Sequence, residues 1–163
     1  MKKLCIMMLF LVWSMVGYSK TYSIPKETVI RLVQETVIGM EKNYRKEWIT
    51  LLAGTLAVET NLGQYKGASK MGITQITKVS YTHNRDLLLK DKDMTKKVVQ
   101  TFKIHPRDIT YSHIVKNHKL SVFFMYLHYK YQGIDIKKAS TPKEAGRIWK
   151  KYYNTYKGKG TVS

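Results

Sequence analysis

The core of this chain is expected to form around the stretch LLAGTLAVETN at residues 51–61, which the stretch GASKMGITQI follows at residues 67–76. The first stretch is apolar almost all round, and a helix of that kind is normally buried in a core. The i, i+3, i+4, i+7 spacing places Glu59 on the same face as five bulky residues, Trp48, Leu51, Leu52, Thr55 and Leu56. A carboxylate therefore ends the apolar stripe of the central helix.

Burial of Glu59 would have a chemical consequence. Removing a carboxylate from water costs free energy and raises its pKa. A carboxylic acid that stays protonated near neutral pH is what general acid catalysis needs. The alternative is a helix-terminal side chain that turns outward to solvent, although the helix dipole disfavours a carboxylate at a C-terminus. The helix alone leaves both interpretations open.

Three blocks of the sequence, in the same order as in the family, resemble the lytic transglycosylase domain of the soluble type, in the goose-type lysozyme superfamily. The first block is Glu59 with the polar loop after it. The second is similar to the Gly-Leu-Met-Gln-Ile turn of the family and carries Gly72, Gln75 and Ile76. The third, residues 152–155, resembles the Ala-Tyr-Asn-Ala-Gly segment. The chain departs from the family pattern directly after Glu59, just before Gln75 and at the end of the third block.

The resemblance implies a fold and an activity. The fold would be mainly α, a lysozyme-like single domain with at most a small β-hairpin near the active-site loop at residues 61–71. The activity would be that of a peptidoglycan lytic transglycosylase, a glycan-cleaving lyase that cuts between N-acetylmuramic acid and N-acetylglucosamine and leaves a 1,6-anhydro sugar. Family members use a single glutamate as acid and then as base, and Glu59 matches it.

The other site residues follow from the same resemblance. Gln75, together with the backbone of Gly72, would position the sugar or its peptide. Tyr153 would hold Glu59 by a hydrogen bond, and Asn154 would support the site. The resemblance implies no metal and no cofactor. Independently, the five histidines form no His-Glu-x-x-His motif and no zinc-ligand spacing.

The first residues predict export. Met1, Lys2 and Lys3 are followed by an apolar run and then by small residues that end at Ser19. This pattern is typical of a secretory signal, here residues 1–19, and predicts a periplasmic or secreted domain over residues 20–163. An uncleaved anchor is the alternative, but the apolar run is short for a membrane span. The single cysteine, Cys5, lies inside the signal, so the mature domain would have no disulfide.

The net charge narrows the class of partner. The chain carries +18, and the predicted signal contributes two lysines and no acid, so the mature domain carries +16. A charge this one-sided favours an acidic partner such as peptidoglycan, another anionic wall polymer or an anionic lipid, unless it serves solubility alone. Export argues against nucleic acid. By analogy with small family members, an envelope-spanning secretion, conjugation or pilus apparatus is an expected further partner.

The sequence is also compatible with other functions. The chain could be a catalytically inactive lysozyme-like module that binds the wall, or a cationic envelope protein that acts on membranes or nucleic acid. A third alternative, a hydrolytic lysozyme, would need a second carboxylate across the sugar. The nearest later acids are Asp86, Asp91 and Asp93, and no motif places any of them there.

Apolar periodicity and capping signals predict the helices. A first helix opens near Pro25 and weakens at Gly39, and the central helix covers residues 46–59. Further helices are expected at residues 84–90, 94–102 and 111–131. A capping box, Thr141-Pro142-Lys143-Glu144, predicts the start of the last helix, which would deliver Tyr153 and Asn154 at its end.

Overall fold

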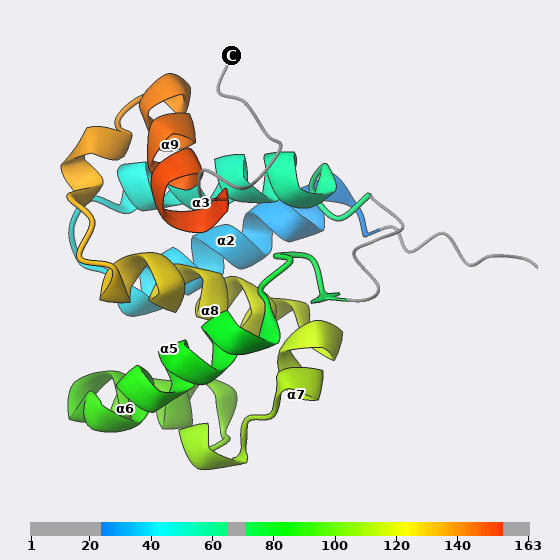
Figure 1. Cartoon of the computed structure of the whole chain (residues 1–163), viewed down its shortest axis with the longest axis vertical. Coiled ribbons are helices and arrows are strands. Elements are labelled where there is room, and N and C mark those ends of the chain that lie inside the picture. Colours follow the sequence, from blue (N-terminus) through cyan, green and yellow to red (C-terminus); the bar gives the residue numbers. More distant parts are fainter. Residues whose placement is uncertain (1–23, 65–70, 155–163) are drawn as a thin grey trace, which may run out of the picture.

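The computed structural model describes residues 24–64 and 71–154, and most of these residues lie in helices (Figure 1). Within these two ranges there is no β-strand, so the expectation of a mainly α fold is confirmed. The predicted signal, residues 1–19, lies outside the described residues. The same holds for residues 65–70 of the loop where a small hairpin was expected. In the described part of the chain, no helix has both the length and the apolar character needed to span a membrane.

Seven α-helices follow one another in the described residues: α2 (Lys26–Met40), α3 (Arg45–Thr60), α5 (Lys78–Lys90), α6 (Lys92–Phe102), α7 (Tyr111–Lys116), α8 (His118–Tyr131) and α9 (Pro142–Trp149). The short 3-10 helices η2 (Pro106–Asp108) and η3 (Ile136–Ala139) lie in the connections. A turn of π-helix, η4 (Lys150–Asn154), continues α9. The predicted central helix is confirmed as α3, with one more residue at each end.

Helix α8 is the element around which the described chain is packed. Its residues from Leu120 to Leu127 are all buried, because α2 and α3 lie along one side and α5 and α7 along the other (Figure 1). Helix α3 behaves differently: its stripe up to Leu56 is buried as predicted, but Gly54, Ala57 and Val58 are exposed. The expectation that α3 is apolar and buried all round was therefore wrong. Small side chains leave little apolar area to hide, so that face tolerates water.

The predicted helix over residues 111–131 is two helices. Asn117 has an extended backbone (φ −104°, ψ 105°), and its side-chain oxygen accepts a hydrogen bond from the Leu120 amide at 3.1 Å. Asparagine favours such an N-cap over a helix interior, because its short amide competes for backbone hydrogen bonds. The apolar pattern continues through Asn117, so periodicity alone missed the break.

Polar caps also explain why two helices begin earlier than predicted. The Thr77 hydroxyl accepts from the Ser80 amide at 3.2 Å and starts α5, and the Asp91 carboxylate accepts from the Met94 amide at 2.9 Å and starts α6. Helix α9 begins where predicted, with the Thr141 hydroxyl accepting from the Glu144 amide at 3.3 Å. The second half of the predicted capping box is replaced, because the Glu144 carboxylate accepts from the Ser140 hydroxyl.

Candidate active site

Glu59 lies in the last turn of α3, where α9 packs across that helix. Its side chain is half-buried, and the indole Nε1 of Trp149 on α9 donates a hydrogen bond to its Oε1 at 2.8 Å. Trp149 itself is only 3% exposed, so the donor has a fixed position. The carboxyl group is therefore oriented by a rigid partner that lies 90 residues further along the chain.

Burial raises the pKa of the Glu59 carboxyl, and the Trp149 hydrogen bond opposes this rise only in part. No cation of the described residues contributes to the pKa of Glu59. A withdrawn carboxyl without a cationic partner keeps its proton to higher pH than an exposed one. Of the two alternatives left open by the sequence, the geometry favours the buried carboxyl over one turned out to solvent.

Two tyrosines lie near this carboxyl. Thr55 donates its hydroxyl hydrogen to the Leu51 carbonyl at 2.9 Å, so the Tyr129 hydroxyl, 2.7 Å from Thr55 Oγ1, is the donor in that pair. The Tyr129 and Tyr153 rings are stacked, with centroids 5.4 Å apart. Burial raises the pKa of both phenols, and the charge of Glu59 raises each of them further. Tyr129 and Tyr153 thus form a stacked aromatic pair beside the carboxyl.

The predicted hydrogen bond from Tyr153 to Glu59 is not formed, and Trp149 takes that place. The Tyr153 hydroxyl donates to the carbonyl oxygen of Thr74 at 2.5 Å instead. The sequence did contain a signal for Trp149, because the i, i+4 spacing puts it on the same face of the last helix as Tyr153. Asn154 is half-buried at the end of η4, and no hydrogen bond joins its side chain to a described residue.

Position 72, in the turn before α5, accepts only glycine without strain. Its φ is +74°, and an added Cβ would lie 3.1 Å from Ser121 Oγ and 3.2 Å from the Ile114 carbonyl oxygen. Gln75, also with positive φ (55°), donates its side-chain amide to the Gly72 carbonyl at 2.7 Å. Gly72 is buried in this turn, so the structure gives it a packing role. The half-buried Gln75 lines a cavity.

Side chains from distant helices bind the backbone of residues 73–76. The Ile73 carbonyl accepts from the Thr60 hydroxyl at 2.8 Å, and the Ile76 carbonyl accepts from the Tyr111 hydroxyl at 2.9 Å. Buried backbone carbonyls outside helices need such partners, since water is not at hand. Thr60 directly follows Glu59, so this irregular segment is fixed against the end of α3 that carries the carboxyl.

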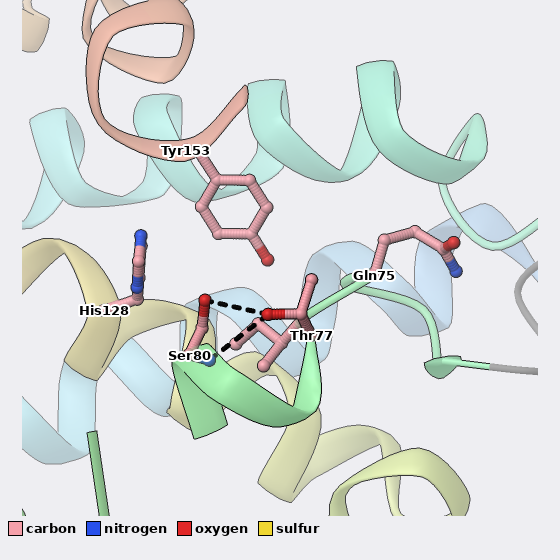
Figure 2. A pocket seen from close by; sticks show the side chains of 6 residues that line it. Gln75, Thr77, Ser80, His128 and Tyr153 are labelled. Atoms are coloured by element: carbon pink, nitrogen blue, oxygen red, sulfur yellow. Dashed lines mark hydrogen bonds between the residues drawn. The ribbon is translucent and has the colours of Figure 1, made fainter. Parts of the chain in front are cut away.

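Figure 2 shows the cavity next to Tyr153, about 40 Å³ in volume and lined by Gln75, Ile76, Thr77, Ser80, His128 and Tyr153. This is space for about one water molecule. The Nε2 atom of His128 is 3.0 Å from the Tyr152 carbonyl oxygen, which can only accept a hydrogen bond. Burial lowers the pKa of the His128 imidazole. Neutral His128 with its proton on Nε2 therefore holds η4, and with it Tyr153, against α8.

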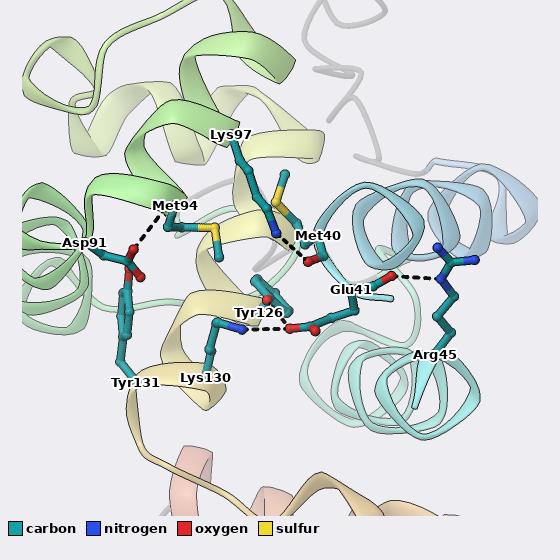
Figure 3. Close-up of polar contacts among 9 residues, drawn as sticks. All are labelled: Met40, Glu41, Arg45, Asp91, Met94, Lys97, Tyr126, Lys130 and Tyr131. Atoms are coloured by element: carbon teal, nitrogen blue, oxygen red, sulfur yellow. Dashed lines mark hydrogen bonds and ion pairs between the residues drawn. The ribbon is translucent and has the colours of Figure 1, made fainter. Parts of the chain in front are cut away.

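A second interior carboxylate, Glu41, has different surroundings (Figure 3). Its Oε1 accepts hydrogen bonds from the Tyr126 hydroxyl and from Lys130 Nζ, the latter at 2.8 Å. Arg45 Nε also donates to the Glu41 backbone carbonyl at 2.8 Å. These contacts join the α2–α3 turn to α8, so Glu41 has a structural role and Glu59 is the better candidate for proton transfer.

Other chemistries find little support in the described residues. Within residues 24–64 and 71–154, no group of three or more His, Cys, Asp or Glu side chains could hold a metal ion. Asp86, the second carboxylate considered for a hydrolase, is exposed on α5 and pairs with Arg85 Nη2 at 3.4 Å. Glu59 is therefore the carboxyl whose surroundings favour acid–base chemistry.

Comparison of the chain with models of protein families, with curated protein sequences and with solved structures finds no match.

Proposed function

We propose that this protein is an exported peptidoglycan lytic transglycosylase with a lysozyme-like fold. The observation that carries the proposal is the half-buried Glu59, whose pKa is raised by burial, with a fixed indole donor and no cation of the described residues beside it. The half-buried Tyr153 supports the proposal because it places an amphipathic aromatic ring beside the carboxyl, and the fully buried Tyr129 stacks behind that ring.

The proposed reaction uses Glu59 twice. The protonated carboxyl gives its proton to the glycosidic oxygen, and the bond from that oxygen to C1 of the muramic acid breaks. The acetamido group of the substrate stabilises the cation. The carboxylate that forms accepts the Trp149 N–H hydrogen bond and then removes the proton from the C6 hydroxyl. The C6 oxygen bonds to C1, so a 1,6-anhydro ring forms, no water is consumed, and Glu59 regains its proton.

The absence of a placed second carboxylate favours this route over hydrolysis. Most glycoside hydrolases use two carboxyl groups, about 5–5.5 Å apart in retaining enzymes and about 6.5–9.5 Å apart in inverting ones. Among the described acids, Asp86 is paired with Arg85, and Glu41 is paired with Lys130. Attack by the C6 hydroxyl of the sugar itself needs no activated water and gains from being intramolecular, with effective molarities up to about 10⁵–10⁸ M.

The remaining parts of the proposal follow from charge and resemblance. The charge of +16 on the mature domain suits an anionic wall, and the predicted signal would place the protein in the periplasm or outside the cell. Gln75 and Asn154 would contact the sugar or its peptide. Service to a secretion or conjugation apparatus would confine wall cleavage to one place.

The test compares Glu59→Gln with Glu47→Gln, both on purified peptidoglycan. Glu47 lies in the first turn of the same helix, about 18 Å from Glu59 along the axis, so it controls for loss of a glutamate on α3. We expect wild type and Glu47→Gln to release products that end in 1,6-anhydro-N-acetylmuramic acid. Glu59→Gln should be slower by at least about 10²–10⁴-fold with unchanged circular dichroism.

Mass analysis of the soluble products separates the alternatives. Reducing ends, heavier by one water, would make the protein a hydrolase. Binding to sacculi without any product would support the inactive wall-binding module. Full activity of Glu59→Gln would move the catalytic site elsewhere.

A further inference from the structure

A cationic pocket lies on the outer side of α9, and nothing in the proposed reaction uses it. Its floor is apolar, formed by Ile134, Ile148 and Tyr152, and its rim carries Lys138, Arg147 and Lys151. The pocket has a volume of about 190 Å³. Pockets that enclose a whole small molecule usually measure about 300–1,000 Å³, so this one suits part of a longer chain.

The rim cations are available to a ligand. Arg147 is exposed and has no recorded hydrogen bond or ion pair with a described residue. Lys151 Nζ lies over the Tyr152 ring, 5.0 Å from its centroid. Lys138 is 3.8 Å from Asp135, the single acid of the pocket, and these side chains are 76% and 55% exposed. An exposed pair of that kind contributes about 0–1 kcal/mol, so Lys138 can exchange Asp135 for another anion.

The pocket and the Glu59 site share one helix. Ile148 and Tyr152 line the pocket, while their neighbours in sequence, Trp149 and Tyr153, lie on the Glu59 side. Consecutive helical residues point about 100° apart, because one turn takes 3.6 residues. A polymer bound at Glu59 could therefore reach the cations on the pocket rim by passing around one side of α9.

The geometry points to the peptide stems of peptidoglycan as the occupant, and we propose that the α9 pocket binds a stem carboxylate during strand cleavage. This inference rests on the proposed function, because the stem is attached to the muramic acid next to the bond that Glu59 would cleave. A guanidinium binds a carboxylate through two parallel hydrogen bonds, and Arg147 is placed to do so. The apolar floor suits the short aliphatic side chains of a peptide better than a polymer of sugar and phosphate.

The test uses the full chain and two versions of one substrate. Glycan strands that carry stems are compared with the same strands after an amidase has removed the stems. The variant is Arg147→Gln with Lys151→Gln. The matched control is Lys92→Gln with Lys96→Gln, which removes two exposed cations from α6, at the other end of the molecule from α9 (Figure 1).

We expect wild type and the control to cleave stem-bearing strands with higher kcat/KM than stripped strands. The α9 variant should lose about tenfold on stem-bearing strands and nothing on stripped strands, the size expected when two exposed charged contacts are removed. A wild type without preference, or a preference that survives in the α9 variant, would overturn the inference and leave the proposed function standing.

If no strand is cleaved at all, that result counts against the proposed function and not against the pocket. A binding measurement then tests the inference by itself. Isolated stem tetrapeptide should bind wild type and the α6 control more tightly than the α9 variant, and less tightly as salt rises. Equal binding to all three proteins would overturn the inference. Binding of a phosphate-containing wall polymer without binding of the tetrapeptide would also overturn it and assign the pocket to phosphate.

Discussion

Replacing Trp149 by Phe isolates the one hydrogen bond that orients Glu59. The change removes the indole N–H that lies 2.8 Å from Glu59 Oε1 and leaves an aromatic ring in the α3–α9 contact. If Glu59 is the acid, it becomes a carboxylate as the glycosidic bond breaks. The N–H bond is stronger to that carboxylate than to the neutral acid, so its loss should slow the chemical step.

The size of the effect follows from that difference. A hydrogen bond between neutral groups contributes about 0.5–1.5 kcal/mol net, and one to a charged group about 1.5–3 kcal/mol. Only the difference, about 1 kcal/mol, acts on the barrier, because the bond exists before and after proton transfer. Since 1.36 kcal/mol is tenfold in rate, kcat should fall by about five- to tenfold. This is far less than the loss expected for Glu59→Gln.

The pH profile gives a second readout, which a merely structural role would not move. The Trp149 bond lowers the pKa of Glu59 against the larger effect of burial, so its removal raises that pKa further. The active form carries the proton and is lost as pH rises through this pKa. The alkaline limb of the kcat profile should therefore move to higher pH in Trp149→Phe.

Trp48→Phe is the matched control, because Trp48 is also buried, lies on α3 and packs on Tyr126 without a recorded bond to Glu59. The assay is the rate of anhydro-product release over a range of pH, with thermal unfolding as the check on folding. A limb that stays in place, or that moves equally in Trp48→Phe, would refute the assignment of Trp149 as the residue that positions Glu59.

Two further predictions concern stability. Burial raises the pKa of Glu59 above 4.5, so above about pH 4.5 the unfolded chain releases this proton while the folded chain still holds it. The free energy of unfolding of wild type therefore falls as pH rises, until the pH passes the pKa of Glu59 in the folded chain. Thermal unfolding should therefore show Glu59→Gln becoming more stable relative to wild type as pH rises above about 4.5, and a difference that stays constant with pH would contradict the burial argument. Gly72→Ala should unfold at a lower temperature than Gly133→Ala. Both glycines have positive φ, which costs another residue about 1–2 kcal/mol, but only at Gly72 would a Cβ meet backbone, the Ile114 carbonyl and Val115 Cα at 3.2 Å. An equal fall in unfolding temperature for the two variants would show that α7 and α8 move apart to accept the added Cβ at residue 72.

Several features of the fold could be predicted from local sequence. The stripe that ends at Glu59 predicted the buried face of α3, because i, i+3 and i+4 side chains must share a face in any helix. Thr141 and Pro142 predicted the start of α9 for an equally local reason. The stripe left the side chain of Glu59 either buried or turned to solvent, and the packing of α9 on α3 decided between the two.

Local patterns were misleading where a polar cap competed with an apolar run. Asn117 divides the predicted long helix into α7 and α8 without interrupting its periodicity, and Thr77 starts α5 on residues with little apolar character. The all-round burial of α8, rather than of α3, depends on which helices cover it. How many helices cover α8 or α3 is a property of the packed fold and not of the sequence of either helix.

The sequence by itself determined that Glu59 ends an apolar stripe, and tertiary structure decided what surrounds it. Trp149 donates to Glu59 across 90 residues of chain, and Tyr153 donates to Thr74 instead, because α9 crosses α3 at an angle that no local pattern encodes. The α9 pocket has the same origin, since Ile134 and Lys138 precede the helix that carries Arg147. Side chains far apart in sequence meet only when burial of the apolar faces has set the helix positions, and a polar contact forms where that packing leaves a donor facing an acceptor.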